Sequence, residues 1–196
     1  MEIQINPRWI KGNWQGGWRL DLHTISSQYN PDGTFDTQRT QLGELLYQLK
    51  YHQDRTQIKP IANLTANFIK DQIKAYPYLA GIVPIPPSNL ERPFQPVLEV
   101  ATEIGAILNL VAPLDYLTKT RPTNPIKNSD SSESRKEELR DALQVKDGRF
   151  QGKFVLLFDD LYRSGETLNA ATEILYNEGG VRKVFVVVLT QTRIKK

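Results

Sequence analysis

The stretch 153–167, K-F-V-L-L-F-D-D-L-Y-R-S-G-E-T, constrains the fold more than any other part of this chain. It begins with an unbroken apolar run, Phe154 to Phe158. An apolar run without alternation is typical of a strand that is buried on both faces of a parallel sheet. The run stops at two adjacent carboxylates, Asp159 and Asp160, where we expect the strand to end. The stretch therefore predicts an α/β fold with a mainly parallel central sheet.

A short loop, 161–165, follows the two acids and leads into a predicted helix. The apolar face of this helix has helical spacing and consists of Leu168, Ala171, Ile174 and Leu175. Two glycines at 179–180 end the helix. Ligands of open α/β sheets bind at the carboxyl ends of strands, so this loop is a candidate binding site.

The residue types in this loop indicate which ligand would bind. A helix N-terminus attracts phosphate through its unpaired N–H groups and its dipole, and Gly165 allows the backbone to approach closely. Ser164 and Thr167 add hydroxyl donors, and Arg163 adds positive charge. The two carboxylates upstream suit sugar hydroxyls, with a metal ion nearby to temper their charge. A phosphate beside diol-binding acids describes a ribose 5-phosphate.

This layout resembles the signature of the type I phosphoribosyltransferases, which is four apolar residues, two acids, two variable residues and a phosphate loop. The matching positions are Phe158, Asp159, Asp160, Leu161, Ser164, Gly165 and Thr167. Arg163 and Glu166 depart from the commonest form, and the Tyr162-Arg163 pair is similar to a variant in the ComF-like, predicted amidophosphoribosyltransferase branch. The alternative interpretation is a buried strand that ends in a structural Asp-Asp turn.

The resemblance implies an enzyme that binds 5-phosphoribosyl 1-pyrophosphate with Mg²⁺ and transfers the phosphoribosyl group to or from a nitrogen nucleophile. Asp159 and Asp160 would be the catalytic, ribose-binding acids. The ribose and its 5-phosphate would be held by these acids together with Tyr162, Arg163, Ser164, Gly165, Glu166 and Thr167. The resemblance implies no metal site made of protein ligands alone, and the nitrogen acceptor stays open.

A proline-rich loop follows the expected strand 79–86 and precedes an expected helix at 97–108. In the resembled fold, the loop after the first core strand binds pyrophosphate, which assigns this role to Pro86, Pro87, Ser88 and Asn89. The later stretch 92–95, R-P-F-Q, partly resembles the ComF-like pattern R-G-F-N-Q. The alternative interpretation is a rigid connector.

A second long polar loop, 119–134, lacks apolar anchors, and such loops in compact domains are often functional lids. In the resembled enzymes a flexible loop at this place closes over the reaction centre. Lys119 and Arg121 are therefore assigned to pyrophosphate, and Lys127 is a further candidate. The alternative is a solvated surface loop. A charged helix is expected at 133–143.

The first 36 residues differ in composition from the rest of the chain. They contain all three tryptophans, and residues 18–25 alternate as in a half-buried strand. We expect a hairpin that turns near Gly16-Gly17, a second turn at 30–33, and a solvated His23. The sequence thus predicts a small β-rich N-terminal appendage, 1–36, and a phosphoribosyltransferase domain, 37–196.

Further helices are expected at 37–50 and 60–75, and further strands at 112–117 and 183–190. The element 49–51, L-K-Y, resembles one that lies ahead of the core in ComF-like proteins, although Lys50 itself is expected on the surface. Because strands and helices alternate from residue 79 onward, we expect right-handed βαβ units.

Composition narrows the classes of function. The 196 residues contain no cysteine, which excludes a disulfide framework, a thiolate zinc site and a cysteine nucleophile. The net charge of +3 does not require a nucleic-acid partner. We find no signal-peptide core and no membrane-length run, so we expect a cytoplasmic protein. We also expect a homo-oligomer. The alternative function is a non-catalytic ComF-like competence or regulatory protein that binds single-stranded DNA, although competence members usually carry a four-cysteine zinc element that this chain lacks.

Overall fold

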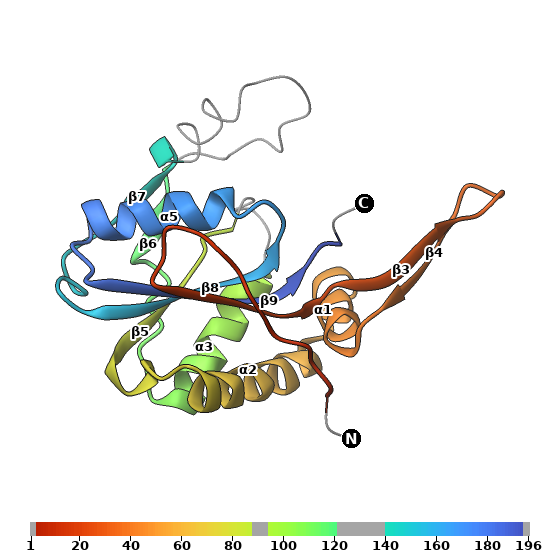
Figure 1. The fold of residues 1–196 in the computed structure, drawn as a ribbon, viewed down its shortest axis with the longest axis horizontal. Helices are drawn as coiled ribbons and strands as arrows, with labels where there is room; N and C mark the ends of the chain where they lie inside the picture. Colours follow the sequence, from red (N-terminus) through yellow and green to blue (C-terminus); the bar gives the residue numbers. More distant parts are fainter. Residues whose placement is uncertain (1–2, 88–93, 121–139, 194–196) are drawn as a thin grey trace.

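The computed structural model describes residues 3–87, 94–120 and 140–193. Its core is a five-stranded sheet with the order β1-β2-β9-β8-β5 (Figure 1). Only β1 is antiparallel to its neighbour, whereas the other three pairings are parallel. The strands are β1 (Arg8–Trp9), β2 (Gly16–Leu22), β5 (Leu79–Pro84), β8 (Phe154–Tyr162) and β9 (Lys183–Gln191). The expected α/β fold with a mainly parallel sheet is confirmed.

Helices cover both faces of this sheet, and each face has its own hydrophobic core. On one face lie α1 (Gln41–Tyr51), α2 (Ile58–Gln72) and α3 (Pro96–Leu108), which pack on Leu156 and Phe158 of β8. On the other face lies α5 (Glu166–Asn177), which packs on Val155 and Leu157 (Figure 1). Short 3₁₀ helices, η1 (Arg55–Gln57) and η2 (Tyr76–Tyr78), join the elements of the first face. The apolar run of β8 is thus buried on both sides, as its lack of alternation indicates.

The N-terminal strands do not follow the expected division of the chain at residue 36. Gly16 and Gly17 lie inside β2 rather than in a turn, and the link from β1 to β2 is formed by residues 10–15. β2 pairs with β9, so it belongs to the central sheet. The sequence did not reveal this pairing because strand alternation marks a half-buried strand without identifying its partner.

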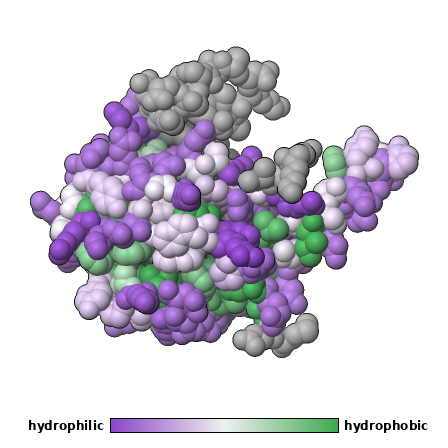
Figure 2. All heavy atoms as spheres, in the orientation of Figure 1, coloured by the Kyte–Doolittle hydropathy of each residue, from purple (hydrophilic) through white to green (hydrophobic). Residues whose placement is uncertain are grey.

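Within the described residues, the hairpin of β3 (Thr24–Tyr29) and β4 (Phe35–Arg39) projects from the body (Figure 1). Its turn is the expected one, with the backbone N–H of Asn30 donating to Thr34 and Gly33 in a left-handed conformation. Figure 2 shows that its surface is mostly hydrophilic, although Tyr29 and Phe35 are exposed and contact each other edge to face.

Two further boundaries differ from expectation. The expected strand at 112–117 is absent: Val111 makes a single bridge to Gly81, and β6 (Leu117–Lys119) pairs instead with β7 (Leu143–Val145) in a separate small sheet. Pro113 interrupts the segment, since proline cannot donate to a ladder. Leu143 lies in β7 rather than in the expected helix 133–143, most of which falls outside the described residues. None of the helices in the described part of the chain combines the length and apolarity needed to cross a bilayer.

Candidate functional site

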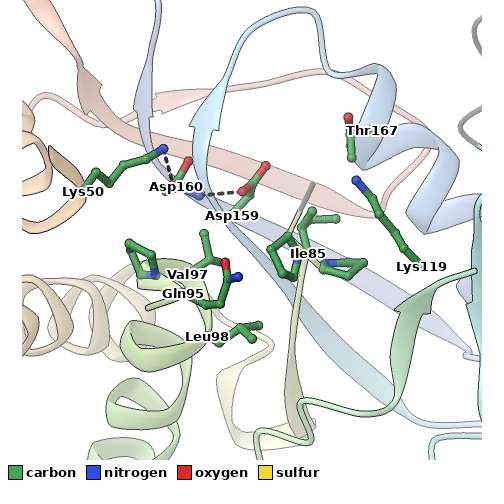
Figure 3. A pocket seen from close by; sticks show the side chains of 12 residues that line it. Lys50, Ile85, Gln95, Val97, Leu98, Lys119, Asp159, Asp160 and Thr167 are labelled. Carbon is green, nitrogen blue, oxygen red and sulfur yellow. Dashed lines mark hydrogen bonds and ion pairs between the residues drawn. The ribbon is translucent and has the colours of Figure 1, made fainter. Parts of the chain in front are cut away.

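A cleft of about 240 Å³ opens at the carboxyl end of β8 (Figure 3). One wall is formed by Ile85, Pro86 and Pro87 after β5 and by the start of α3. Its polar lining consists of Lys50, Gln95, Lys119, Asp159, Asp160 and Thr167. The cleft therefore gathers side chains from α1, α3, β6, β8 and α5 at the place where open α/β sheets bind ligands.

The two acids lie within β8 and not just beyond it. The strand continues to Tyr162 because β9 pairs with it along its whole length, from Phe154 with Lys183 to Tyr162 with Gln191. Successive side chains of a strand point to opposite sides. Asp160 consequently points toward α1, whereas Asp159 points toward Lys119 and Thr167 (Figure 3). The expected strand end at Asp159 was wrong by three residues, and this extension separates the two carboxylates.

Asp160 is bound by Lys50, the residue that the sequence analysis expected on the surface. The Lys50 Nζ lies 2.8 Å from the Asp160 Oδ2, and both side chains are largely buried, with 23% and 12% of their surface exposed. Burial alone would lower the pKa of Lys50, but the charge and hydrogen bond of Asp160 outweigh it and raise this pKa. Lys50 is therefore a firmly charged part of the cleft, and the L-K-Y element was the one sequence signal that pointed to it.

Asp159 has a different environment from its neighbour. Its Oδ1 accepts a hydrogen bond of 2.8 Å from the backbone N–H of Asp160. Desolvation by the surrounding protein atoms, and then the charge of Asp160, raise the pKa of Asp159 well above its usual range. This carboxyl would therefore gain most from a bound cation or from hydroxyl donors.

The N-terminus of α5 forms the other end of the cleft. Gly165 is its N-cap, with φ of 82°, and as a glycine it supplies no side-chain cap of its own. A Cβ at this position would lie 2.9 Å from the ring of Tyr162, which is half-buried against it, so the close turn requires glycine. Thr167 lines the cleft, and Arg163 and Ser164 are exposed in the loop before the helix. Glu166 is the first residue of α5. This arrangement presents backbone N–H groups to an anion.

The first turn of α5 is held in place by the β1–β2 link. Asn13 donates its backbone N–H to the Oδ1 of Asn169 and its side-chain amide to the carbonyl of Asn169, each at 2.9 Å. No local sequence pattern indicates this contact, because the two residues are 156 positions apart.

The pyrophosphate candidates divide between described and undescribed parts of the chain. Pro86 and Pro87 line the cleft, whereas Ser88, Asn89, Arg121 and Lys127, together with most of the expected lid, lie outside the described residues. Lys119 lines the cleft across from Asp159, and burial lowers its pKa while Asp159 opposes that effect. Gln95 also lines the cleft, at a position that the R-P-F-Q resemblance had marked.

His23 is a second residue whose place differs from expectation. It is half-buried behind Asp160 rather than solvated. Its Nδ1 lies 3.3 Å from the Thr190 Oγ1, and this hydroxyl donates to the Asp160 carbonyl at 3.2 Å. Since the hydroxyl proton is used in that bond, His23 would donate from Nδ1. Burial, followed by the charges of Arg39 and Lys50, lowers the pKa of His23.

No protein-family model matches the sequence, and no curated protein matches it either. Solved structures do resemble the fold. The glutamine phosphoribosylpyrophosphate amidotransferase from B. subtilis is 18% identical, with 83% of this chain and 35% of that chain covered and a TM-score of 0.51. The orotate phosphoribosyltransferase from Aeropyrum pernix is 13% identical, with 86% and 76% covered and a TM-score of 0.48.

The UMP synthase of Leishmania donovani is 17% identical, with 85% of this chain covered and a TM-score of 0.44, and the chain spans only 28% of its length. The chain therefore spans about a third or less of the amidotransferase and of this synthase. At such low identities the likeness concerns the fold alone. The chain has the type I phosphoribosyltransferase fold, with a mainly parallel sheet between two layers of helices.

Proposed function

We propose that the protein is a phosphoribosyltransferase, which binds 5-phosphoribosyl 1-pyrophosphate with Mg²⁺ and transfers the phosphoribosyl group to or from a nitrogen nucleophile. The observation that carries this proposal is the cleft itself. It brings the carboxyl group of Asp159, the half-buried ammonium of Lys119 and the N-terminus of α5 to one end of β8. The fold supports the proposal, because ligands bind at this edge of parallel sheets.

Each part of the ligand has a matching part of the cleft. The 5-phosphate would accept hydrogen bonds from the first N–H groups of α5 and from Thr167, with Arg163 and Ser164 at the rim. The ribose hydroxyls would donate to Asp159 and Asp160. The pyrophosphate would lie on the side of Pro86, Pro87 and Lys119.

Catalysis at such a site would consist mainly of positioning and charge stabilisation. The transition state of phosphoribosyl transfer has oxocarbenium character, so positive charge develops on the ribose ring. Asp159 and Asp160 would lie near this charge, and their fixed place on a central strand means that little reorganisation is needed at the moment of reaction. Lys119 would stabilise the negative charge that the leaving pyrophosphate gains.

The cleft fits Mg²⁺ if the ion is held chiefly by the ligand. Mg²⁺ prefers oxygen donors, keeps several waters and is often bound through one or two carboxylates plus substrate phosphates. Asp159 would be the carboxylate for this role, and the described residues contain no group of three or more histidine, cysteine or acidic side chains that could hold the ion alone. When bound, the ion would supply positive charge that offsets the negative charge of the pyrophosphate.

Within this class we favour the ComF-like branch, because the L-K-Y element places Lys50 in the cleft and not on an unrelated surface. We also expect a cytoplasmic homo-oligomer. The acceptor stays undefined. The hairpin β3–β4 is a poor surface for single-stranded DNA, because its strands and turn contain Asp32 and Asp36 but a single basic residue, Arg39.

Calorimetry separates the enzyme from a DNA-binding protein on the same fold. The parent should bind 5-phosphoribosyl 1-pyrophosphate with Mg²⁺, and the variant with Asp159→Asn and Asp160→Asn should bind it at least about tenfold more weakly, because charged hydrogen bonds contribute about 1.5–3 kcal/mol. A DNA-binding protein would show the opposite pattern, since removing two acids reduces repulsion from phosphates. No binding of the ligand by the parent would defeat the enzyme proposal.

A further inference from the structure

Contacts at the start of α1 hold this helix against the sheet, and Lys50 lies in its last turn. The Thr40 Oγ1 donates to the carbonyl of Leu22 at 2.6 Å and also caps the helix by accepting from the N–H of Gly43. Gly43 packs so closely on the end of β2 that a Cβ there would lie 2.1 Å from the carbonyl oxygen of His23. Leu49, beside Lys50, is completely buried in the core. Lys50 therefore starts from a rigid backbone.

The ion pair between Lys50 and Asp160 is expected to add little to the stability of the fold. Both side chains are largely withdrawn from water, at 23% and 12% exposure, so each has lost hydration that the partner only partly replaces. Lysine also loses considerable rotamer freedom when its ammonium is held in one place. A pair of this kind in the polar lining of a cleft is better explained by what it does to Asp160.

Asp160 is held from a second direction as well. The Thr190 hydroxyl donates to its backbone carbonyl at 3.2 Å and also contacts His23. The backbone of Asp160 is thus fixed by β9, and its Oδ2 is fixed by Lys50 at 2.8 Å. Asp159 carries a raised pKa caused by desolvation and by the charge of Asp160.

We infer that Lys50 is a positioning residue of the ribose site, which acts through Asp160. Its ammonium fixes one carboxylate oxygen, so that the other is presented to a ribose hydroxyl, and it offsets one of two adjacent negative charges beside a polyanionic ligand. Asp159 is then the acid that is left to a cation or a second hydroxyl. This inference rests on the proposed function, since it assumes that the cleft binds a phosphorylated ribose.

A double-mutant cycle tests whether Lys50 acts through Asp160 or contacts the ligand directly. Four proteins are compared by calorimetry with 5-phosphoribosyl 1-pyrophosphate and Mg²⁺: the parent, Lys50→Met, Asp160→Asn and the double variant. We expect Lys50→Met to weaken binding about tenfold in the parent and less than about twofold in the Asp160→Asn background. Lys50→Arg should recover most of the affinity, because it keeps a charge that pairs with a carboxylate.

Control variants distinguish a specific loss of ligand affinity from misfolding. Lys70→Met removes an exposed lysine of α2 and should leave the affinity unchanged. Thermal melts identify variants that fold poorly, and Lys50→Gln replaces Lys50→Met if the latter does not fold. Equal weakening by Lys50→Met in both backgrounds, or none in the parent, would overturn the inference. Loss of binding by Asp159→Asn with unchanged binding by Lys50→Met would overturn it while the proposed function stands. A parent that does not bind the ligand defeats both.

Discussion

Asp159 and Asp160 are adjacent in the sequence, but their carboxyl groups lie on opposite faces of β8 and have different surroundings. Asp160 faces α1, where an ammonium pairs with it at 2.8 Å. Asp159 faces the start of α5, where desolvation and the neighbouring charge raise its pKa. The difference follows from strand alternation, because β8 extends through both acids. On one side of the strand a carboxylate is held by an ion pair, and on the other side a carboxyl group resists ionisation because it is desolvated beside a charged neighbour.

The largest expected effect comes from the packing that supports the ordered side. Leu49→Ala removes a fully buried side chain next to Lys50 and should reduce the free energy of unfolding by about 2–5 kcal/mol, because it leaves a cavity in the core. Urea denaturation measures the change. The matched control is Leu114→Ala, whose side chain is half exposed and should cost less than about 0.5 kcal/mol. Similar losses for both variants would show that α1 is not anchored as described.

Replacing the two acids one at a time should change the free energy of unfolding in opposite directions, downward for Asp160→Asn and upward for Asp159→Asn. Asp160→Asn leaves the largely buried ammonium of Lys50 without its charge partner and should destabilise by about 1–3 kcal/mol. Asp159→Asn removes a carboxyl that resists ionisation and should stabilise by about 0.5–2 kcal/mol near neutral pH, as substitutions at strained functional sites often do.

The stabilisation by Asp159→Asn should also depend on pH. Because the pKa of Asp159 is raised above 3.8, the folded protein keeps a proton that the unfolded chain has released. Stability of the parent relative to the variant therefore falls as the pH rises from about 3.8 toward the raised pKa of the folded state. Thermal melts of both single variants across this range check the signs. Destabilisation by both substitutions would remove the contrast between the two acids.

The start of α5 offers a smaller test on the ligand side. Gly165→Ala places a Cβ 2.9 Å from the Tyr162 ring at a φ of 82°, so it should destabilise by about 1 kcal/mol or somewhat more and weaken ligand binding. Gly152→Ala is the matched control, because its φ is also positive, at 71°, but its Cβ meets nothing within 4 Å. If both alanines have the same effect on ligand affinity, the close turn at Gly165 has no special role in the site.

The smallest expected effect concerns His23 behind Asp160. Burial and the charges of Arg39 and Lys50 lower its pKa, so the folded protein favours the neutral ring. The unfolded chain then binds more protons below its ordinary pKa of about 6.5, and stability should fall as the pH decreases through this value. His23→Gln should reduce this slope, with a Tm difference of about 1–3 °C between pH 7 and pH 5. An unchanged slope would mean that His23 titrates as it does in the unfolded chain.

Much of this fold could be predicted from local patterns. The apolar runs of β8 and β9 and the periodic leucines of α1 identify their elements, because burial on two faces and burial on one stripe leave different spacings. Local patterns do not predict which strands pair with one another. The pairing of β2 with β9 and the separate sheet of β6 and β7 depend on contacts between distant residues, which no local pattern encodes.

In the site, too, the residues of one local stretch could be predicted, and those from distant parts of the chain could not. Asp159, Asp160 and Thr167 could be assigned to the cleft, and Gly165 to the turn beside it, because they lie at the end of one strand and at the start of the next helix, within a single short stretch. Lys50 and His23 could not be placed, since Lys50 pairs with Asp160 from a helix more than a hundred residues earlier in the chain and His23 contacts Thr190, 167 residues later. A lysine at the edge of a helical apolar face is usually solvated, and only the fold shows that this one faces a carboxylate.

The most direct test of the account is a crystal structure of the protein with ribose 5-phosphate and Mg²⁺. We expect the phosphate within hydrogen-bonding distance of the first backbone N–H groups of α5, and the ribose hydroxyls on Asp159 and on the Asp160 oxygen that Lys50 leaves free. The Lys50–Asp160 pair should keep its 2.8 Å contact. A ligand bound elsewhere, or a phosphate held on the Lys50 side of β8 with the α5 N-terminus empty, would contradict the account.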